Sequence, residues 1–254
     1  MRILTLGTRG YVDVWNRRHR NHTGFLIEHE GKRILIDVGE PEFLRHKPDA
    51  ILFTHFHPDH FNVPEKPDAP AFAAEFSKAQ GAPDYVKYVP DRKILRVGDL
   101  RFLPWPVLHS LRCPAVAWFL LDYGVCFAPD FVEFIKAPYD LDIRLAFVDG
   151  SSVSKDLIRR KDDKVFGHAS LKRIRRRFER LFPGLDVRVV HFGSELIKAG
   201  FEKETEIERE LDVVCLADGS AVALSQKIEL RERIHIDEFL PHLPPQMVLS
   251  RGYY

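Results

Sequence analysis

The chain has 254 residues, 45% of them hydrophobic, and a formal net charge of +1 at pH 7. This length suits one domain of ordinary size, or two smaller ones, with ample apolar residues for a core. The near-neutral charge argues against a protein that coats a polyanion. The three cysteines lie far apart and form no C-x-x-C pair, which argues against a disulfide framework and against a thiolate zinc site. We expect buried thiols in a cytoplasmic protein, and no apolar run is long enough to span a membrane.

The amino-terminal part of the chain predicts strands around a basic loop. Residues 3–6 read as a strand, and residues 24–29 and 33–38 read as the two strands of a hairpin. The loop over residues 15–22 contains Arg17, Arg18 and Arg20 and has no apolar periodicity. It is either a solvated charged loop or an anion-binding lip, because guanidinium groups match the geometry of phosphate oxygens.

The densest group of metal-binding side chains follows a predicted buried strand over residues 50–53. It contains His55, His57, Asp59 and His60, and imidazole and carboxylate are common ligands of zinc and related divalent ions. His55 and His57 are two residues apart, so in extended backbone they project from the same side and can share an ion. Pro58 fixes a turn, after which Asp59 and His60 can reach a second ion.

Further polar side chains follow predicted strands later in the chain. His109 follows the strand over residues 100–108, and Asp130 follows the strand over residues 125–128. Asp122 competes with Asp130 as an acidic strand-end residue, but its position before Tyr123-Gly124 is better explained by a turn. His191 ends a strand that begins at residue 187, and His168 precedes a strong helix over residues 171–182.

The remaining elements have no direct link to a site. They are an amphipathic helix over residues 71–80, strands over 85–89, 94–97, 115–122 and 144–148, an acidic helix over 202–211, and a hairpin formed by 213–217 and 221–224. From Lys155 to Arg188 there are twelve Lys or Arg residues against five Asp or Glu. This basic stretch is either an ordinary solvated surface or a field that steers an anionic substrate.

The loop over residues 55–60 fits the H-x-H-x-D-H signature and resembles the metallo-β-lactamase superfamily. The motif pattern is most similar to the branch of phosphodiesterases and ribonuclease Z, in which a Gly-His pair, here Gly167-His168, starts a helix and a later strand ends in a ligand histidine. The resemblance implies an α/β fold, a four-layer αβ/βα sandwich of two mixed β-sheets flanked by helices. We expect residues 1–225 to form the catalytic domain. Residues 226–254 would form an extension that packs on it or mediates a subunit contact in a homo-oligomer.

The resemblance also implies a site for two divalent ions. The first is expected to bind His55, His57 and His109, the second Asp59, His60 and His191, and Asp130 is expected to bridge both. His168 is expected to face the substrate, and the exchange of roles between His168 and His191 is the alternative. Asp37 is expected to orient the metal loop, unless it only caps the turn before Glu40-Pro41. Nitrogen and oxygen ligands suit zinc, with manganese or iron as alternatives.

The implied activity is metal-dependent hydrolysis, with Asp59, Asp130 and His168 as catalytic groups. We expect a phosphodiester substrate, in nucleic acid or a nucleotide-like molecule, with its phosphate contacted by His168, Arg17, Arg18 and Arg20. The chain has no glycine-rich segment after the metal loop and no long insertion of the kind that grips transfer RNA, which argues against transfer-RNA processing. One alternative is hydrolysis of an ester, thioester or lactone in an apolar pocket lined by Trp15, Trp105 and Trp118. Another is a non-catalytic nucleic-acid-binding module with structural metals.

Overall fold

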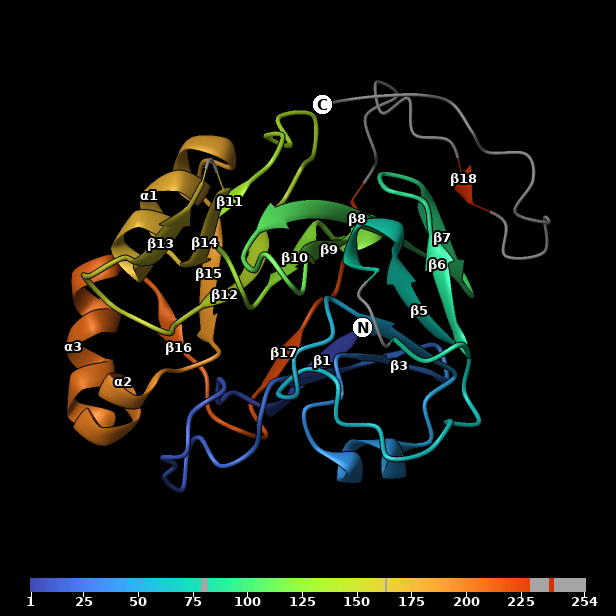
Figure 1. The fold of residues 1–254 in the computed structure, drawn as a ribbon, viewed down its shortest axis with the longest axis horizontal. Coiled ribbons are helices and arrows are strands. Elements are labelled where there is room, and N and C mark those ends of the chain that lie inside the picture. Colours follow the sequence, from blue (N-terminus) through green and yellow to red (C-terminus); the bar gives the residue numbers. More distant parts are fainter. Residues whose placement is uncertain (79–81, 163, 229–237, 240–254) are drawn as a thin grey trace.

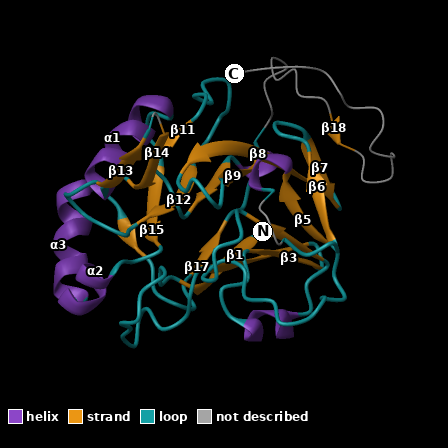
Figure 2. Ribbon diagram, viewed as in Figure 1, coloured by secondary structure: helices purple, strands orange, loops and turns teal. Residues whose placement is uncertain are grey.

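Two mixed β-sheets pack against each other at the centre of the fold (Figures 1 and 2). The computed structural model describes residues 1–78, 82–162, 164–228 and 238–239. The first sheet has the strand order β17-β1-β2-β3-β4-β5-β6. Its strands are β1 (Arg2–Gly7), β2 (Gly24–His29), β3 (Lys32–Ile36), β4 (Ala50–Phe53), β5 (Ala71–Ala74), β6 (Val86–Val89) and β17 (Ala221–Ala223). Strands β3 to β6 run parallel, and the others pair antiparallel.

The second sheet has the order β16-β15-β12-β10-β9-β8-β7-β18, and β11 pairs with β8 beside this path. Its strands are β7 (Ile94–Val97), β8 (Leu100–Leu108), β9 (Ala115–Leu120), β10 (Val125–Ala128), β11 (Glu133–Phe134), β12 (Leu145–Asp149), β15 (Asp186–Val190), β16 (Val214–Cys215) and β18 (Glu238–Phe239). Strands β10, β12, β15 and β16 run parallel, so their carboxyl ends lie at one edge of the sheet. Chemistry in α/β folds commonly occurs at such an edge.

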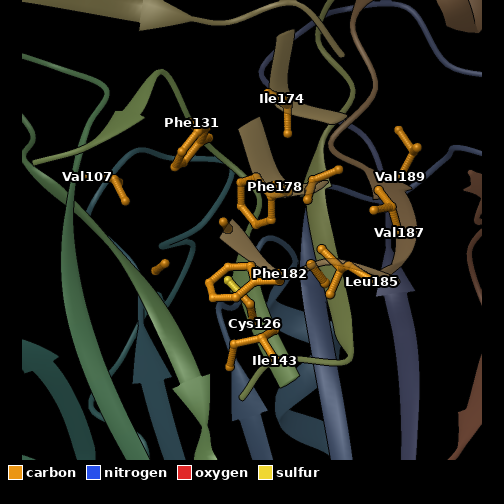
Figure 3. Close-up of a cluster of buried hydrophobic side chains, with 14 of the residues drawn as sticks. Val107, Cys126, Phe131, Ile143, Ile174, Phe178, Phe182, Leu185, Val187 and Val189 are labelled. Atoms are coloured by element: carbon orange, nitrogen blue, oxygen red, sulfur yellow. The ribbon is translucent and has the colours of Figure 1, made fainter. Parts of the chain in front are cut away.

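Three apolar layers hold these elements together. One fills the space between the two sheets and includes Phe25, Trp118 and Phe127. The second lies between the second sheet and the helices α1 (Leu171–Leu181), α2 (Ser194–Ala199) and α3 (Phe201–Leu211). Figure 3 shows Phe178 of this layer among side chains of the second sheet. The third layer covers the outer face of the first sheet with the 3₁₀ helix η1 (Pro41–His46) and the loop that follows β4.

The expected fold class, two mixed sheets in a layered α/β sandwich, is confirmed. The predicted stripe on the 171–182 helix is also present, because Leu171, Ile174, Phe178 and Leu181 are all buried. One outer layer differs from the expectation, since short 3₁₀ helices and loops, rather than α-helices, cover the first sheet. None of the helices in the described ranges is long and apolar enough to cross a membrane.

Two predicted elements are wrong. The helix predicted over 71–80 is absent from its described part, because residues 71–74 are the buried parallel strand β5 and residues 75–77 a single 3₁₀ turn, η2 (Glu75–Ser77). The strands predicted over 213–217 and 221–224 do not pair with each other. Strand β16 joins β15 in the second sheet, whereas β17 joins β1 in the first. Sequence reasoning also missed the hairpin β13 (Leu157–Lys161) and β14 (Lys164–His168), which forms a two-stranded sheet of its own.

The predicted carboxy-terminal extension lies mostly outside the described residues. Within it, the pair Glu238–Phe239 adds to β7 in parallel orientation, and Ile228 donates its backbone N–H to the carbonyl of Asp122. A division into a domain over 1–225 and an extension over 226–254 therefore remains a prediction.

Candidate metal centre

The predicted ligands converge where several strands end at the junction of the two sheets. The loop with His55 and His60 leaves the carboxyl end of β4, and His109 follows β8. Asp130 lies two residues beyond β10, and His191 follows β15. Side chains separated by up to 136 positions in the sequence therefore meet at one place, as the strand order requires.

The imidazoles of the first expected group lie close together. His55 Nε2 is 3.0 Å from His57 Nδ1, which is 3.1 Å from His109 Nε2. These three nitrogens, which face one another, can share one ion. His55 and His109 are 0% and 5% exposed, so the group is open to solvent mainly beside His57.

The second expected group lies beside the first and also converges. One ligand atom from each of Asp59, His60 and His191 falls within 4.8 Å of the others. Asp130 lies between the two groups: its Oδ2 is 2.6 Å from His60 Nε2 and 3.4 Å from His55 Nε2, and its Oδ1 is 3.3 Å from His191 Nε2. Its carboxylate thus reaches ligands of both groups.

The chemistry of this cluster fits bound cations. Both carboxylate oxygens of Asp59 and of Asp130, together with His60 Nε2, are buried and have no hydrogen-bond partner. His60 Nδ1 donates to Asp37, and its Nε2 lies 2.6 Å from Asp130 Oδ2. Burial opposes protonation of His60, but Asp59, Asp130 and Asp37 around it raise its pKa well above the ordinary value. Buried acceptors without donors are costly, and a divalent ion satisfies several of them at once.

Neighbouring groups fix the orientation of the candidate ligands. Asp37, fully buried, accepts hydrogen bonds of 2.8 Å from His60 Nδ1, Thr54 Oγ1 and the backbone N–H of Thr54. Thr23 Oγ1 is 3.0 Å from His191 Nδ1, which turns His191 Nε2 toward the carboxylates. Such partners hold ligand rings in the geometry and tautomer that a metal requires.

His168 lies at the rim of the cluster with a partner of its own. Its Nδ1 donates to Asp149 Oδ2 over 2.7 Å and is 3.2 Å from Asp130 Oδ1. Asp149 ends β12, is fully buried and also accepts from the backbone N–H groups of Phe131 and Ser151. Sequence reasoning did not assign Asp149 a role, although its place at a strand end was a signal of the same kind as Asp130.

The shifts in pKa indicate which side chains of the cluster are charged and which are neutral. Burial lowers the pKa of His55 well below its ordinary value and that of His109 to about 4, so both rings are neutral. Burial opposes ionisation of Asp130, but His109, His191 and His60 around it hold its pKa well below the usual range. Burial likewise opposes protonation of His168, yet Asp149 and Asp130 raise its pKa to about 9. Carboxylates and neutral imidazoles are the forms that bind metals, so ion binding would release the proton that the raised pKa of His60 favours.

A cavity of about 480 Å³ opens over the cluster. Its lining includes His57, Asp59, His109, Asp130, His168 and His191, together with Tyr11, Val12, Leu157, Ser151, Ser152 and Glu195. All of the metal-binding candidates except the deeper His55 and His60 therefore face this space. No lysine or arginine of the described chain is among its lining residues.

The predicted arginine lip does not reach this cavity. Arg18 pairs with the buried Glu204 at 2.9 Å, and Arg20 lines a separate pocket with Arg9 and Glu40. Arg17 is exposed and is not among the residues lining the cavity over the cluster. The role of Arg17, Arg18 and Arg20 in holding substrate at this site is therefore not supported by their positions.

The tryptophans expected to line an apolar pocket lie elsewhere. Trp118 is fully buried in the core and donates to the carbonyl of Phe53. Trp105 is 5% exposed and donates to the carbonyl of Lys136, and Trp15 lines the pocket that contains Arg20. None of the three tryptophans lines the cavity over the cluster.

Comparison with known proteins agrees with the fold and the cluster. A region of 66 residues is 41% identical to ribonuclease Z from Streptomyces coelicolor, covering 23% of this chain and 21% of that protein. Among solved structures, a diphosphatase of the PhnP family is similar with a TM-score of 0.63 and 19% identity, covering 90% of this chain and 99% of the other. The short form of human tRNase Z gives a TM-score of 0.58 at 14% identity, covering 89% and 100%. The family model for the β-lactamase superfamily domain matches residues 18–227. The chain therefore belongs to the β-lactamase superfamily, as its metal loop predicted.

Proposed function

We propose that this protein is a hydrolase that uses two divalent metal ions to cleave phosphodiester bonds. The observation that carries the proposal is the position of Asp130. Its buried carboxylate has no hydrogen-bond partner and reaches ligands of two separate groups. A single structural ion needs about four ligands in a closed site, whereas seven candidates around a shared carboxylate suit two ions with an open position.

The first ion would be held by His55, His57 and His109, and the second by Asp59, His60 and His191, with Asp130 shared. The nitrogen and oxygen donors suit zinc best, and manganese and iron are compatible with them. When bound, such ions supply Lewis acidity and lower the pKa of a coordinated water from 15.7 toward about 7. Membership of the superfamily supports the use of divalent metals.

The protein's own groups complete the chemistry. Both oxygens of Asp59 are free of hydrogen bonds, and its side chain lines the cavity, so it can accept a hydrogen bond from the attacking water. His168 keeps Nδ1 on Asp149 and faces the same cavity. We assign His168 the task of donating a proton to a phosphate oxygen or to the leaving alkoxide, with Asp149 fixing its orientation.

Two observations support a phosphate-containing substrate. A protonated His168 beside the cluster favours an anion, and the similar ribonuclease Z and PhnP-family diphosphatase act, by their names, on phosphate-containing molecules. The matching segment spans about a fifth of the ribonuclease Z chain, so the full activity of ribonuclease Z is not transferred to this protein. We also propose a cytoplasmic location, which the three free, buried cysteines support.

A second candidate, hydrolysis of an ester, thioester or lactone, is favoured by one observation. The cavity wall includes Tyr11, Val12 and Leu157 but no lysine or arginine of the described chain. Such a wall suits an apolar acyl group, and the same cluster could serve both reactions. The third candidate, a binding module with structural metals, is disfavoured by the open cavity over the candidate ligands.

The test is an activity panel on metal-reconstituted protein. It compares bis-p-nitrophenyl phosphate, short RNA, short DNA and an acyl ester, using wild type, His168→Asn and the exposed control His46→Asn. We expect diester cleavage that falls about 10²- to 10⁴-fold in His168→Asn and is unchanged in His46→Asn. Turnover of the acyl ester alone, insensitive to His168→Asn, would establish the second candidate instead. Oligonucleotide binding without cleavage of any substrate would favour the third.

A further inference from the structure

The hairpin β13–β14 begins and ends at the candidate metal centre. Its first residue, Leu157, lines the cavity, and its last residue is His168. Gly167 donates its backbone N–H to the carbonyl of His109 over 2.6 Å, and His109 Nδ1 donates to the carbonyl of Gly167 over 3.2 Å. The base of the hairpin is therefore attached to a candidate metal ligand, while the rest pairs with no other described strand.

One face of this hairpin continues outward from the cavity. Side chains alternate along a strand, so Arg159 and Lys161 project from the same side of β13 as Leu157. The register places Phe166 opposite Arg159 and Lys164 opposite Lys161. We call Arg159, Lys161, Lys164 and Phe166 the basic face. Arg160 projects from the other side of the hairpin.

The cations of the basic face have no acidic partner among the described residues. Arg159, Lys161 and Lys164 are exposed, and none forms an ion pair with a described residue. Lys161 and Lys164 lie directly opposite each other, an arrangement of like charges that destabilises a strand pair. The two-stranded sheet is also marginal by itself, so the arrangement costs stability with no partner in the described chain.

The neighbouring helix α1 differs in this respect. Four of its six cations pair with acids: Lys172 with Glu210, Arg173 with Asp156, Arg175 with Glu179 and Arg177 with Glu133. The exposed Arg176 and Arg180 form no ion pair with a described residue. Most of the charge of α1 is thus balanced by ion pairs within the fold. The cations of the basic face have no acidic partner among the described residues, so they can bind an anion from outside the chain.

We propose that the basic face binds the backbone of a single-stranded nucleic acid whose target phosphodiester lies in the cavity. This inference rests on the proposed function. From Leu157 to Lys161 the strand rises about 14 Å, taking about 3.4 Å per residue, which is enough to follow a few nucleotides. Lys161, Lys164 and Arg159 contact successive phosphates, and Phe166 offers a ring on which a base stacks. Basic grooves with interleaved aromatic side chains are typical of single-strand binding.

Lys161→Gln combined with Lys164→Gln tests the proposal, and Arg160→Gln is the matched control on the other face of the same hairpin. Fluorescence anisotropy measures the binding of fluorescein-labelled phosphorothioate DNA and RNA 12-mers to metal-loaded protein over a range of salt concentrations. About that length is sufficient to span the hairpin. We expect the double variant to bind at least about tenfold more weakly. Its salt slope should fall by about 1.4, since each single-strand phosphate contact contributes about 0.7. Phe166→Leu should weaken binding without changing the slope.

Several results would overturn the proposal. One is equal oligonucleotide affinity in wild type and the double variant. Another is an equal loss in Arg160→Gln, which would mean that total charge rather than the basic face is responsible. Loss of binding to anionic phosphatidylserine vesicles, with oligonucleotide binding retained, would identify a membrane as the partner instead. The metal content of each preparation, measured by inductively coupled plasma mass spectrometry, checks that the metal centre has formed independently of any activity.

The outcomes for the two proposals are separable. Face-dependent oligonucleotide binding without any phosphodiester cleavage would support the basic face and refute the proposed reaction. Cleavage of bis-p-nitrophenyl phosphate with face-independent oligonucleotide binding would support the reaction and refute the basic face.

Discussion

Replacing Asp37 by asparagine tests how the candidate metal centre is oriented. Asp37 is fully buried and accepts three hydrogen bonds of 2.8 Å, two at Oδ2 from His60 and Thr54 Oγ1 and one at Oδ1 from the Thr54 N–H. Asparagine has one acceptor oxygen. If that oxygen keeps the two bonds at Oδ2, its NH₂ group faces the N–H of Thr54, and a buried donor loses its partner.

The expected magnitudes follow from this geometry. An unsatisfied buried N–H costs about 1–3 kcal/mol, and losing the charge weakens the two remaining hydrogen bonds, so we expect the metal-free protein to lose about 3 kcal/mol of stability. Because His60 is no longer held as firmly, metal affinity should fall about 10- to 100-fold. Urea denaturation measures the first quantity, and competition with a chromophoric chelator measures the second.

Asp49→Asn is the matched control. Asp49 also accepts a backbone N–H, that of Arg33, together with the ammonium of Lys32, but it lies outside the cluster and is partly exposed. We expect it to cost less than about 1 kcal/mol and to leave metal affinity unchanged. If Asp37→Asn lowers stability while metal affinity stays at the wild-type value, Asp37 only caps its turn and our reasoning about orientation is wrong.

Three further predictions follow from other contacts. Asp149→Asn removes the carboxylate that holds His168 Nδ1, so kcat for a diester should drop about 10²-fold or more. The drop should be larger for an alkoxide than for a p-nitrophenolate leaving group. Equal losses for both leaving groups would argue against proton donation by His168. Thr23→Val removes the partner of His191 Nδ1 with little change in volume, so the ion proposed to bind His191 should lose about tenfold in affinity. A zinc titration measures this loss, and an unchanged titration would contradict this role. Although burial opposes ionisation of Glu204, the hydrogen bond from His19 and the charge of Arg18 hold its pKa below the usual value. Its contribution is therefore present above about pH 4.3 and is lost as the pH falls through the folded-state pKa. Glu204→Gln should lower the free energy of unfolding by about 1–3 kcal/mol at pH 7 and by much less at pH 3, whereas an equal loss at both pH values would show that ionisation of Glu204 is not the cause.

The metal loop could be predicted from sequence because its spacing is local. His55, His57, Asp59 and His60 lie within six residues after a buried strand, so one loop places all four. The distant members, such as His191, were found because they directly follow apolar strands. Parallel strands bring their carboxyl ends to one edge, which explains why strand ends were a useful guide.

The errors arose where the tertiary structure overrides local preference. Ala71-Phe72-Ala73-Ala74 has helix-forming alanines, yet these residues pair between β4 and β6 in the interior of a parallel sheet, where a continuous apolar run is favourable. The turn at Asp218-Gly219 resembles a hairpin turn. The carboxylate of Asp218 instead accepts hydrogen bonds from Thr8 Oγ1 and from the backbone N–H groups of Arg20 and Asn21. These bonds attach the arginine loop to a connection between the two sheets.

Two features could not be read correctly from local sequence, because their partners lie elsewhere in the fold. The hairpin β13–β14 is rich in Arg and Lys and lacks apolar alternation, so only its pairing in space identifies it. The arginine loop shows the opposite case, since its composition indicated anion binding but Arg18 is engaged by the buried Glu204, a residue 186 positions away. Composition alone could not distinguish an internal ion pair from a substrate contact.

The most direct test of the metal centre is anomalous X-ray diffraction at the zinc edge from crystals of the zinc-reconstituted protein. Our account predicts two anomalous peaks, one among His55, His57 and His109 and one among Asp59, His60 and His191, with Asp130 between them. A single peak, or no peak within this cluster, would contradict a two-metal hydrolase.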